Sequence, residues 1–186
     1  MIYSFFISET QIKDYTAIDA NVEVEEIRPF VIQAQDTKLQ SVLGTDFFVE
    51  LMTKINDDTL SDKEKELIKY YIQPLLANYI VYLAIPTMTY KLFNKSVLQP
   101  TAEEATTIGL DVVKYLRDGY LNTSKFYTDR LVDYLCDNST DFATYTTFSQ
   151  DGMSPMSNNS YNGFYIPNNI HRRPNGYDYP IIKNKN

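Results

Sequence analysis

The chain has 186 residues, with 17 Lys and Arg against 24 Asp and Glu and a formal net charge of -7. This length suits one domain with or without an appendage, and such a chain buries enough surface to fold without disulfides. One Cys and one His exclude a disulfide framework and a multi-histidine metal site. The acidic balance argues against binding of nucleic acid by charge alone. The 16 Tyr and 10 Phe residues suit contact surfaces as well as cores.

The first part of the chain divides into an irregular segment and a series of helices. Residues 1–20 lack helical spacing, so we expect an edge strand or an arm that packs on a neighbour. Asn21 is a suitable N-cap for a first helix, whose buried face is indicated by Ile27, Phe30, Val31 and Ala34. Gly44 is suited to end a short helical turn. Thr45 is placed to cap the next helix, which we expect to end at residues 56–58.

A long apolar helix is predicted next. Ser61 and Glu64 form a capping box, and an apolar pattern then runs to Leu83. Pro74 and Pro86 are expected to bend or interrupt this run, because proline lacks the helical donor and crowds the preceding turn. The 21 uncharged residues from Tyr70 to Tyr90 include both prolines and several polar side chains. We therefore predict a helix buried at the centre of a bundle and no membrane span.

The same start signal recurs at Thr101 and Glu104. One face of the helix that follows is marked by Ala105, Ile108, Val112, Leu116 and Tyr120. A break is expected near Gly119, followed by a last helix with Tyr127, Leu131, Tyr134 and Leu135. The fold prediction is therefore all-α: a small bundle of four to five helices over residues 21–145, with an extended, largely irregular C-terminal arm.

Residues 146–186 have the composition of an interaction arm. The last 37 residues carry a net charge of +2 and hold four of the eight prolines, whereas the rest of the chain carries -9. Such a segment cannot build a core of its own, yet its aromatic and Ile residues are poor choices for solvated coil. An arm that orders on a partner explains both features. The predicted partner-binding residues are the apolar anchors Tyr161, Phe164, Tyr165, Ile166, Tyr177 and Tyr179, with Arg172 and Arg173 as charged anchors.

An acidic stripe is predicted on the last helix. Asp129, Asp133 and Asp137 recur every four residues, which places them on one side of the helix. They could form a carboxylate site for a metal, but no His accompanies them and no second helix offers partner carboxylates. A solvated or channel-facing surface is the favoured interpretation. No glycine-rich phosphate loop is present, and we expect no enzyme activity, no metal and no cofactor.

The segment Ile12 to Leu51, with Val42-Leu43-Gly44-Thr45 at its centre, resembles the head–tail adaptor proteins of crAss-like and related tailed bacteriophages. A later element, Leu131-Val132-Asp133-Tyr134-Leu135 followed by Asn138, is similar to the end of that family's last bundle helix. Together these segments relate residues 12–145 to the family.

The resemblance implies a structural virion protein. It implies a ring of identical subunits, commonly a dodecamer, that binds the portal protein at the neck of the particle and offers a surface to a tail or second ring protein. DNA would pass through the channel without sequence-specific contact, and the particle would be assembled in the cytoplasm of the bacterial host. Two alternatives stay open: a non-viral all-α binding module with a ligand-recognition tail, and a carboxylate-dependent metalloenzyme built on the acidic stripe.

Overall fold

The described part of the chain is an all-α bundle, as predicted. The computed structural model describes residues 3–18, 22, 24–89, 91–93, 96–98, 109–146, 152–157, 160–161 and 164–165. Counting each uninterrupted helical run once, these residues form four long helices and two short ones. The long runs are Val24–Leu43, Thr45–Asn56, Asp62–Thr89 and Leu110–Asp137, and the short ones are Glu9–Tyr15 and Ala143–Thr146.

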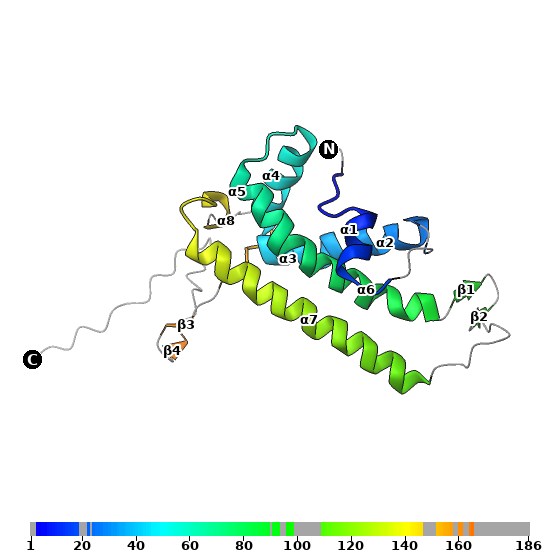
Figure 1. The fold of residues 1–186 in the computed structure, drawn as a ribbon. Coiled ribbons are helices and arrows are strands. Elements are labelled where there is room, and N and C mark those ends of the chain that lie inside the picture. The colour runs from blue at the N-terminus through cyan, green and yellow to red at the C-terminus, as the bar shows by residue number, and fades with distance from the viewer. Residues whose placement is uncertain are drawn as a thin grey trace, which may run out of the picture.

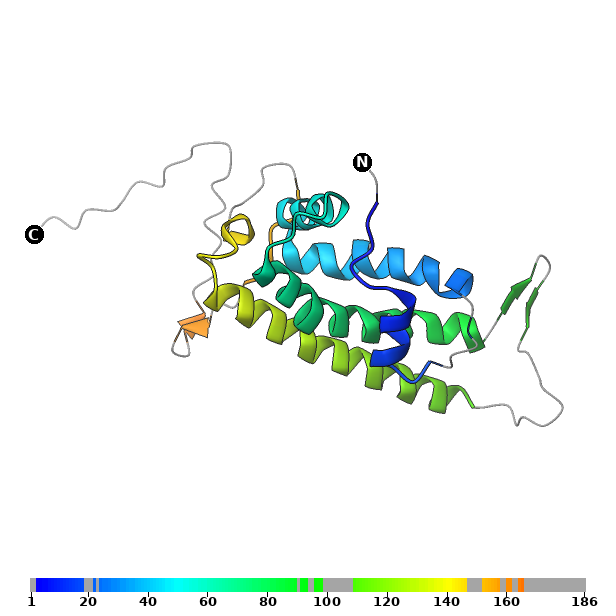
Figure 2. The ribbon, with the colours of Figure 1, turned by 45° about the horizontal axis from the view of Figure 1, so that its top comes forward.

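Three long runs lie side by side (Figure 2). The first combines α2 (Val24–Ala34), η1 (Gln35–Leu39) and α3 (Gln40–Leu43), and the second combines α5 (Asp62–Leu67), η2 (Ile68–Ile72) and α6 (Gln73–Thr89). The third is α7 (Leu110–Asp137). Helix α6 packs against both α2 and α7, and its buried apolar residues cover about two thirds of its circumference: Leu75, Leu76, Ala77, Ile80, Val81 and Ala84. This confirms the predicted central helix.

Two π-turns interrupt the first two runs, and the second explains how Pro74 is accommodated. In η2 the Gln73 N–H donates to the carbonyl of Ile68, five residues earlier. Pro74, which has no N–H, is the second residue after this turn, so the irregular hydrogen bonding falls where a regular helix could not be completed. Pro86 does not end the helix, because α6 continues to Thr89.

Helix α7 is longer than the sequence suggests. The predicted break near Gly119 is wrong, since α7 passes through this residue without interruption. Two hydrogen bonds are made close to this glycine. The Thr123 hydroxyl donates to the Gly119 carbonyl at 3.0 Å, and the Arg117 guanidinium donates to the Tyr82 hydroxyl of α6 at 3.0 Å. The predicted start at Thr101, with Ala105 and Ile108, lies outside the described residues.

The N-terminal segment is only partly irregular. Residues 3–7 are extended, but Glu9–Tyr15 forms α1, which corrects the expectation for residues 1–20. Its start is a capping box: the Ser8 hydroxyl accepts from the Gln11 N–H, and the Gln11 side chain accepts from the Ser8 N–H at 2.9 Å. Helix α1 packs across α6 and buries Ile12.

The remaining elements are short. A hairpin of β1 (Lys91–Phe93) and β2 (Ser96–Leu98) lies between α6 and α7, and a second hairpin pairs β3 (Ser160–Tyr161) with β4 (Phe164–Tyr165) (Figure 1). Helix α8 (Ala143–Thr146) packs on α4 (Thr45–Asn56). Phe47 of α4 lies against the rings of Phe142 and Tyr145 with centroids 5.9 Å and 6.0 Å away. The core therefore extends to the end of the predicted bundle.

Candidate interaction surfaces

Two buried glutamines hold the extended N-terminal segment against the bundle. Gln35, fully buried, accepts from the Phe6 N–H at 2.9 Å and donates to the Ser4 carbonyl at 3.1 Å. Gln73 donates to the Phe6 carbonyl at 3.1 Å. These amides take the place of a neighbouring β-strand, because they satisfy backbone groups that would otherwise be buried without partners.

Each glutamine lies at one end of a π-turn. Gln35 begins η1, and Gln73 directly follows η2. A π-turn adds one residue to a helical turn and shifts the side chains after it around the axis, and such turns are frequent at functional sites. Here they coincide with the two side chains that fix residues 4–6. The sequence shows no signal for this arrangement, since the residues lie far apart in the chain.

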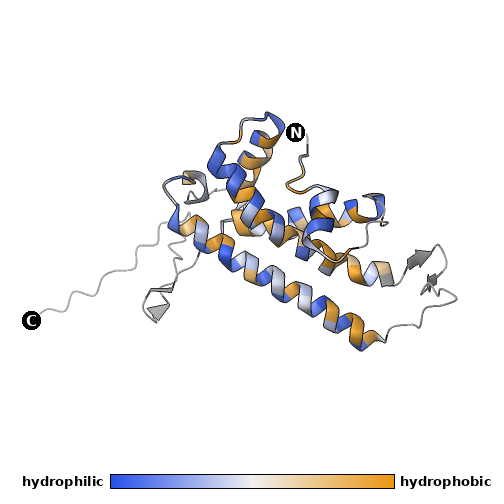
Figure 3. Cartoon of the chain, in the orientation of Figure 1, coloured by the Kyte–Doolittle hydropathy of each residue, from blue (hydrophilic) through white to orange (hydrophobic). Residues whose placement is uncertain are grey.

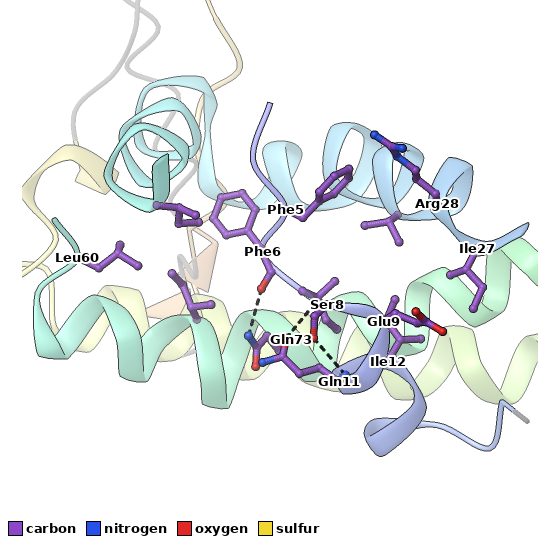
Figure 4. A pocket seen from close by; sticks show the side chains of 14 residues that line it. Phe5, Phe6, Ser8, Glu9, Gln11, Ile12, Ile27, Arg28, Leu60 and Gln73 are labelled. Atoms are coloured by element: carbon purple, nitrogen blue, oxygen red, sulfur yellow. Dashed lines mark hydrogen bonds between the residues drawn. The ribbon is translucent and has the colours of Figure 1, made fainter. Parts of the chain in front are cut away.

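A groove lies beside this segment (Figure 4). Its volume is about 600 Å³, and it runs between residues 5–12, helix α2 and the start of the α5–α6 run. Its apolar walls include Phe5, Phe6, Ile27, Val31, Leu60 and Ile68. The size and lining suit apolar side chains of a bound segment.

Of the two charged residues that line the groove, Glu9 has an ion-pair partner and Arg28 has none among the described residues. Glu9 is paired with Lys13 at 2.5 Å. Arg28 lies 5.8 Å from the centroid of the Phe5 ring and, among the described residues, forms no ion pair. The free charge beside this apolar groove is therefore positive.

A second apolar surface follows the outer side of α7. The side chains of Val112 and Leu116, predicted to lie on one face of this helix, are exposed by 49% and 46%. Tyr115 is exposed by 78% and Phe126 by 62%. We call Val112, Tyr115, Leu116 and Phe126 the α7 stripe; Figure 3 shows apolar residues near the N-terminal end of α7.

The geometry of an α-helix explains why these side chains share a side. At about 100° per residue, Val112, Tyr115 and Phe126 fall on the face opposite Leu131 and Leu135, which are buried against the bundle. Large exposed apolar patches on a protein surface are typical of interaction sites. The stripe is thus a helix face that the described residues leave without a neighbour.

The predicted acidic stripe lies on the surface of α7. Asp129, Asp133 and Asp137 are all exposed. Asp133 and Asp137 continue the outward face of Phe126, seven and eleven residues further on. Asp129 instead lies near Lys38 of η1, whose pKa is lowered by burial and partly restored by the charge of Asp129. Within the described ranges no three His, Cys, Asp or Glu side chains come together as metal ligands.

The beginning of the C-terminal arm is attached to the bundle. Residues 152–157 run along the junction between α3 and α4, where the Thr45 N–H donates to the Met153 carbonyl at 2.9 Å. The Met153 N–H donates to the Thr45 hydroxyl at 2.8 Å, and the Met156 N–H donates to the Val42 carbonyl at 3.0 Å. Thr45 was predicted to cap α4, but Gly44 is the N-cap residue. The Thr45 hydroxyl accepts the hydrogen bond from Met153 in the arm instead.

The predicted arm anchors are only partly described. Tyr161 lies in β3, and Phe164 and Tyr165 form β4. The side chains of these three residues, together with Ile166, Arg172, Arg173, Tyr177 and Tyr179, lie outside the described residues.

Two tyrosines with raised pKa values bind the N-terminal segment and the beginning of the C-terminal arm to the bundle. Burial and a hydrogen bond to Asp36, 2.7 Å long, raise the pKa of Tyr3 to about 12. Burial also raises the pKa of Tyr145, whose hydroxyl donates to the Met156 carbonyl. Both phenols therefore stay protonated at neutral pH and act as hydrogen-bond donors.

The site is thus a set of contact surfaces on an all-α bundle: a groove, an exposed helix face and an anchored arm. Residues 39–151, which run from the end of η1 beyond α8, match the family of unknown function DUF6712. The chain belongs to this family. Comparisons with curated proteins and with solved structures gave no match. No helix among the described residues has the length and apolar character needed to cross a membrane.

Proposed function

We infer that this protein is a structural subunit of a tailed-bacteriophage virion. Copies of the chain would form a ring beneath the portal protein, connect the capsid to the tail and lengthen the channel for DNA. The resemblance of residues 12–51 and 131–138 to head–tail adaptors suggests this role. It would act at the neck of the virion after assembly in the host cytoplasm.

The observation that carries the proposal is the exposed α7 stripe. A free-standing bundle gains nothing from four large apolar side chains that are exposed to water. A subunit that packs against another protein buries them and gains about 25 cal/mol for each Å² removed from water. The exposed carboxylates of Asp133 and Asp137 suit a channel wall, because negative charge does not adhere to passing phosphates.

The second candidate is a non-viral binding module with a ligand-recognition tail. The apolar groove beside residues 5–12 favours it, since a single peptide partner could occupy such a groove. In this alternative the protein would act as a monomer and bind one ligand per chain.

Native mass spectrometry and electron microscopy of the full chain separate the two candidates. The ring proposal predicts closed rings of one size, with a central channel, that bind the portal of the same phage. A stable monomer over the micromolar range, with no affinity for that portal, would contradict the ring and leave the binding module as the better account.

A further inference from the structure

The groove and the α7 stripe lie on different sides of the bundle. Helix α6 packs on α2 at one side and on α7 at the other, and Figure 2 shows α6 between them. The groove is formed by α2 and the segment before α1, whereas the stripe faces away from the buried side of α7. Each surface is apolar, and neither can cover the other within one chain.

We propose that the α7 stripe of one copy of this chain binds in the groove of the next copy. The first turns of α7, with Val112, Tyr115 and Leu116, are the segment that enters the groove. The proposal rests on self-assembly of the chain, as in the proposed function, and specifies which two surfaces meet.

Symmetry favours two different surfaces. A contact between identical faces pairs two copies around a two-fold axis and stops there. A contact between different faces continues from copy to copy, and it closes into a ring when the rotation between copies allows closure. A chain that carries two apolar surfaces on separate sides can make this contact between different faces.

Charge also favours the groove over a second α7 as the neighbour of the stripe. Asp111 and Asp118 flank Tyr115 and are exposed, with Lys114 between them; no ion pair of Asp111 or Asp118 occurs among the described residues. Two such helices would bring like charges together. The groove offers Arg28, whose guanidinium lacks a carboxylate partner in the described part of the chain.

The groove matches the first turns of α7 in size. Most of its apolar lining side chains, such as Phe6 and Ile27, are themselves buried, so the groove is a hollow for a few inserted side chains and not a broad face. Val112, Tyr115 and Leu116 lie within two turns of α7 and are exposed by 49%, 78% and 46%. The groove of about 600 Å³ has room for the side chains of one or two helical turns.

Two single variants on opposite surfaces test the proposal. Tyr115→Glu alters only the stripe, and Phe5→Glu alters only the groove. We expect each variant alone to be a folded monomer by native mass spectrometry and circular dichroism. An equimolar mixture is expected to form one-to-one dimers, because one groove and one stripe remain intact, and the dimers cannot grow further.

The controls keep the outcome interpretable. Tyr70, 51% exposed on η2, belongs to neither surface, so Tyr70→Glu should form rings as the wild type does. Arg28→Glu is a second groove variant at an exposed position, for use if Phe5→Glu does not fold. It should also fail to form rings and should pair with Tyr115→Glu.

Each other outcome overturns a defined statement. Rings that persist in Tyr115→Glu or in both groove variants, or variants that do not pair when mixed, would overturn this interface while the ring itself stands. A groove variant that blocks rings while Tyr115→Glu does not would assign the groove to another occupant, such as the C-terminal arm. A monomeric wild type would overturn both the interface and the proposed function.

Discussion

Gly44 shows how a single residue can join three parts of this molecule. Its φ of 77° and ψ of 160° fall in a region that essentially only glycine occupies. This conformation ends α3 and begins α4 without an intervening loop. A Cβ atom at this position would lie 2.8 Å from the backbone N and 2.9 Å from the ring Cδ of Pro155. The same residue therefore sets the angle between two helices and admits the start of the arm.

Gly44→Ala is expected to destabilise the protein by about 1–3 kcal/mol, because the backbone is strained and the Pro155 contact must move. Urea unfolding measures this loss, and limited proteolysis between residues 146 and 160 should become faster. Gly119→Ala is the matched control. Its Cβ meets no atom within 4 Å, and it should leave stability unchanged or raise it by about 0.5–1 kcal/mol. Equal losses in both variants would contradict the special role of Gly44.

At the scale of the element, the helix starts show what the sequence can predict. Ser61 and Glu64 form the predicted capping box in full: the Ser61 hydroxyl accepts from the Glu64 N–H, and the Glu64 carboxylate accepts from the Ser61 N–H at 2.8 Å. The equivalent box of Ser8 and Gln11 is also visible in the sequence, but the apolar residues before it favoured an extended segment. Local motifs are recognisable because all their partners lie within one turn.

The buried Glu64 gives the α5 start a dependence on pH. Burial alone would raise the pKa of its carboxyl group, but hydrogen bonds from Lys54, 2.6 Å away, and from Ser61 outweigh burial and lower it. Because the pKa is lower in the folded than in the unfolded chain, the stabilisation is present above the unfolded value near 4.5. It is lost as the pH falls through the folded value.

Glu64→Gln should therefore cost about 1.5–3 kcal/mol at pH 7, the range for hydrogen bonds to a charged group. The cost should shrink as the pH falls below the pKa of the folded state, because the wild-type carboxylate is then protonated too. Denaturant unfolding from pH 7 down to pH 3 measures the difference. Glu66→Gln, at an exposed neighbouring position, should change little at either pH. A cost for Glu64→Gln that does not depend on pH would show that shape, and not charge, matters at this position.

Tertiary contacts explain what the sequence does not reveal about the elements. The pattern around Gly119 indicates a break, yet α7 is continuous there. One glycine inside a helix costs only about 0.5–1 kcal/mol, which the packing of α7 against α6 offsets. The helical spacing of Val112 and Leu116 correctly marks an apolar face, but spacing alone cannot tell burial in the core from exposure on an outer face. The contacts of Gln35 with Ser4 and Phe6 cross about 30 residues and leave no local pattern.

At the scale of the whole molecule, charge and chemistry are divided between the bundle and the arm. The last 37 residues carry +2 and the rest of the chain carries -9. The attachment of residues 152–157 at the α3–α4 junction fixes the point from which the remaining chain departs. Every copy in an assembly would then present its arm from the same place, and repeated weak contacts would add up around a ring.

Two truncations separate the anchored part of the arm from the rest. A chain that ends at residue 157 keeps the contacts of Met153 and Met156 with the bundle, and it should unfold at the same urea concentration as the full chain. A chain that ends at residue 151 loses their four hydrogen bonds and should be less stable by roughly 2–6 kcal/mol, since each is worth about 0.5–1.5 kcal/mol net.

Assembly should respond differently from stability in these two chains. Both truncations remove the predicted aromatic and Arg anchors, so both should bind a portal or neighbouring subunit less tightly than the full chain, while only the shorter one unfolds earlier. Native mass spectrometry with increasing salt measures the first property, and contacts that involve Arg172 and Arg173 should weaken first. If the chain that ends at 157 assembled as tightly as the full protein, the arm would not be a contact element, and the α7 stripe with the groove would have to account for assembly alone.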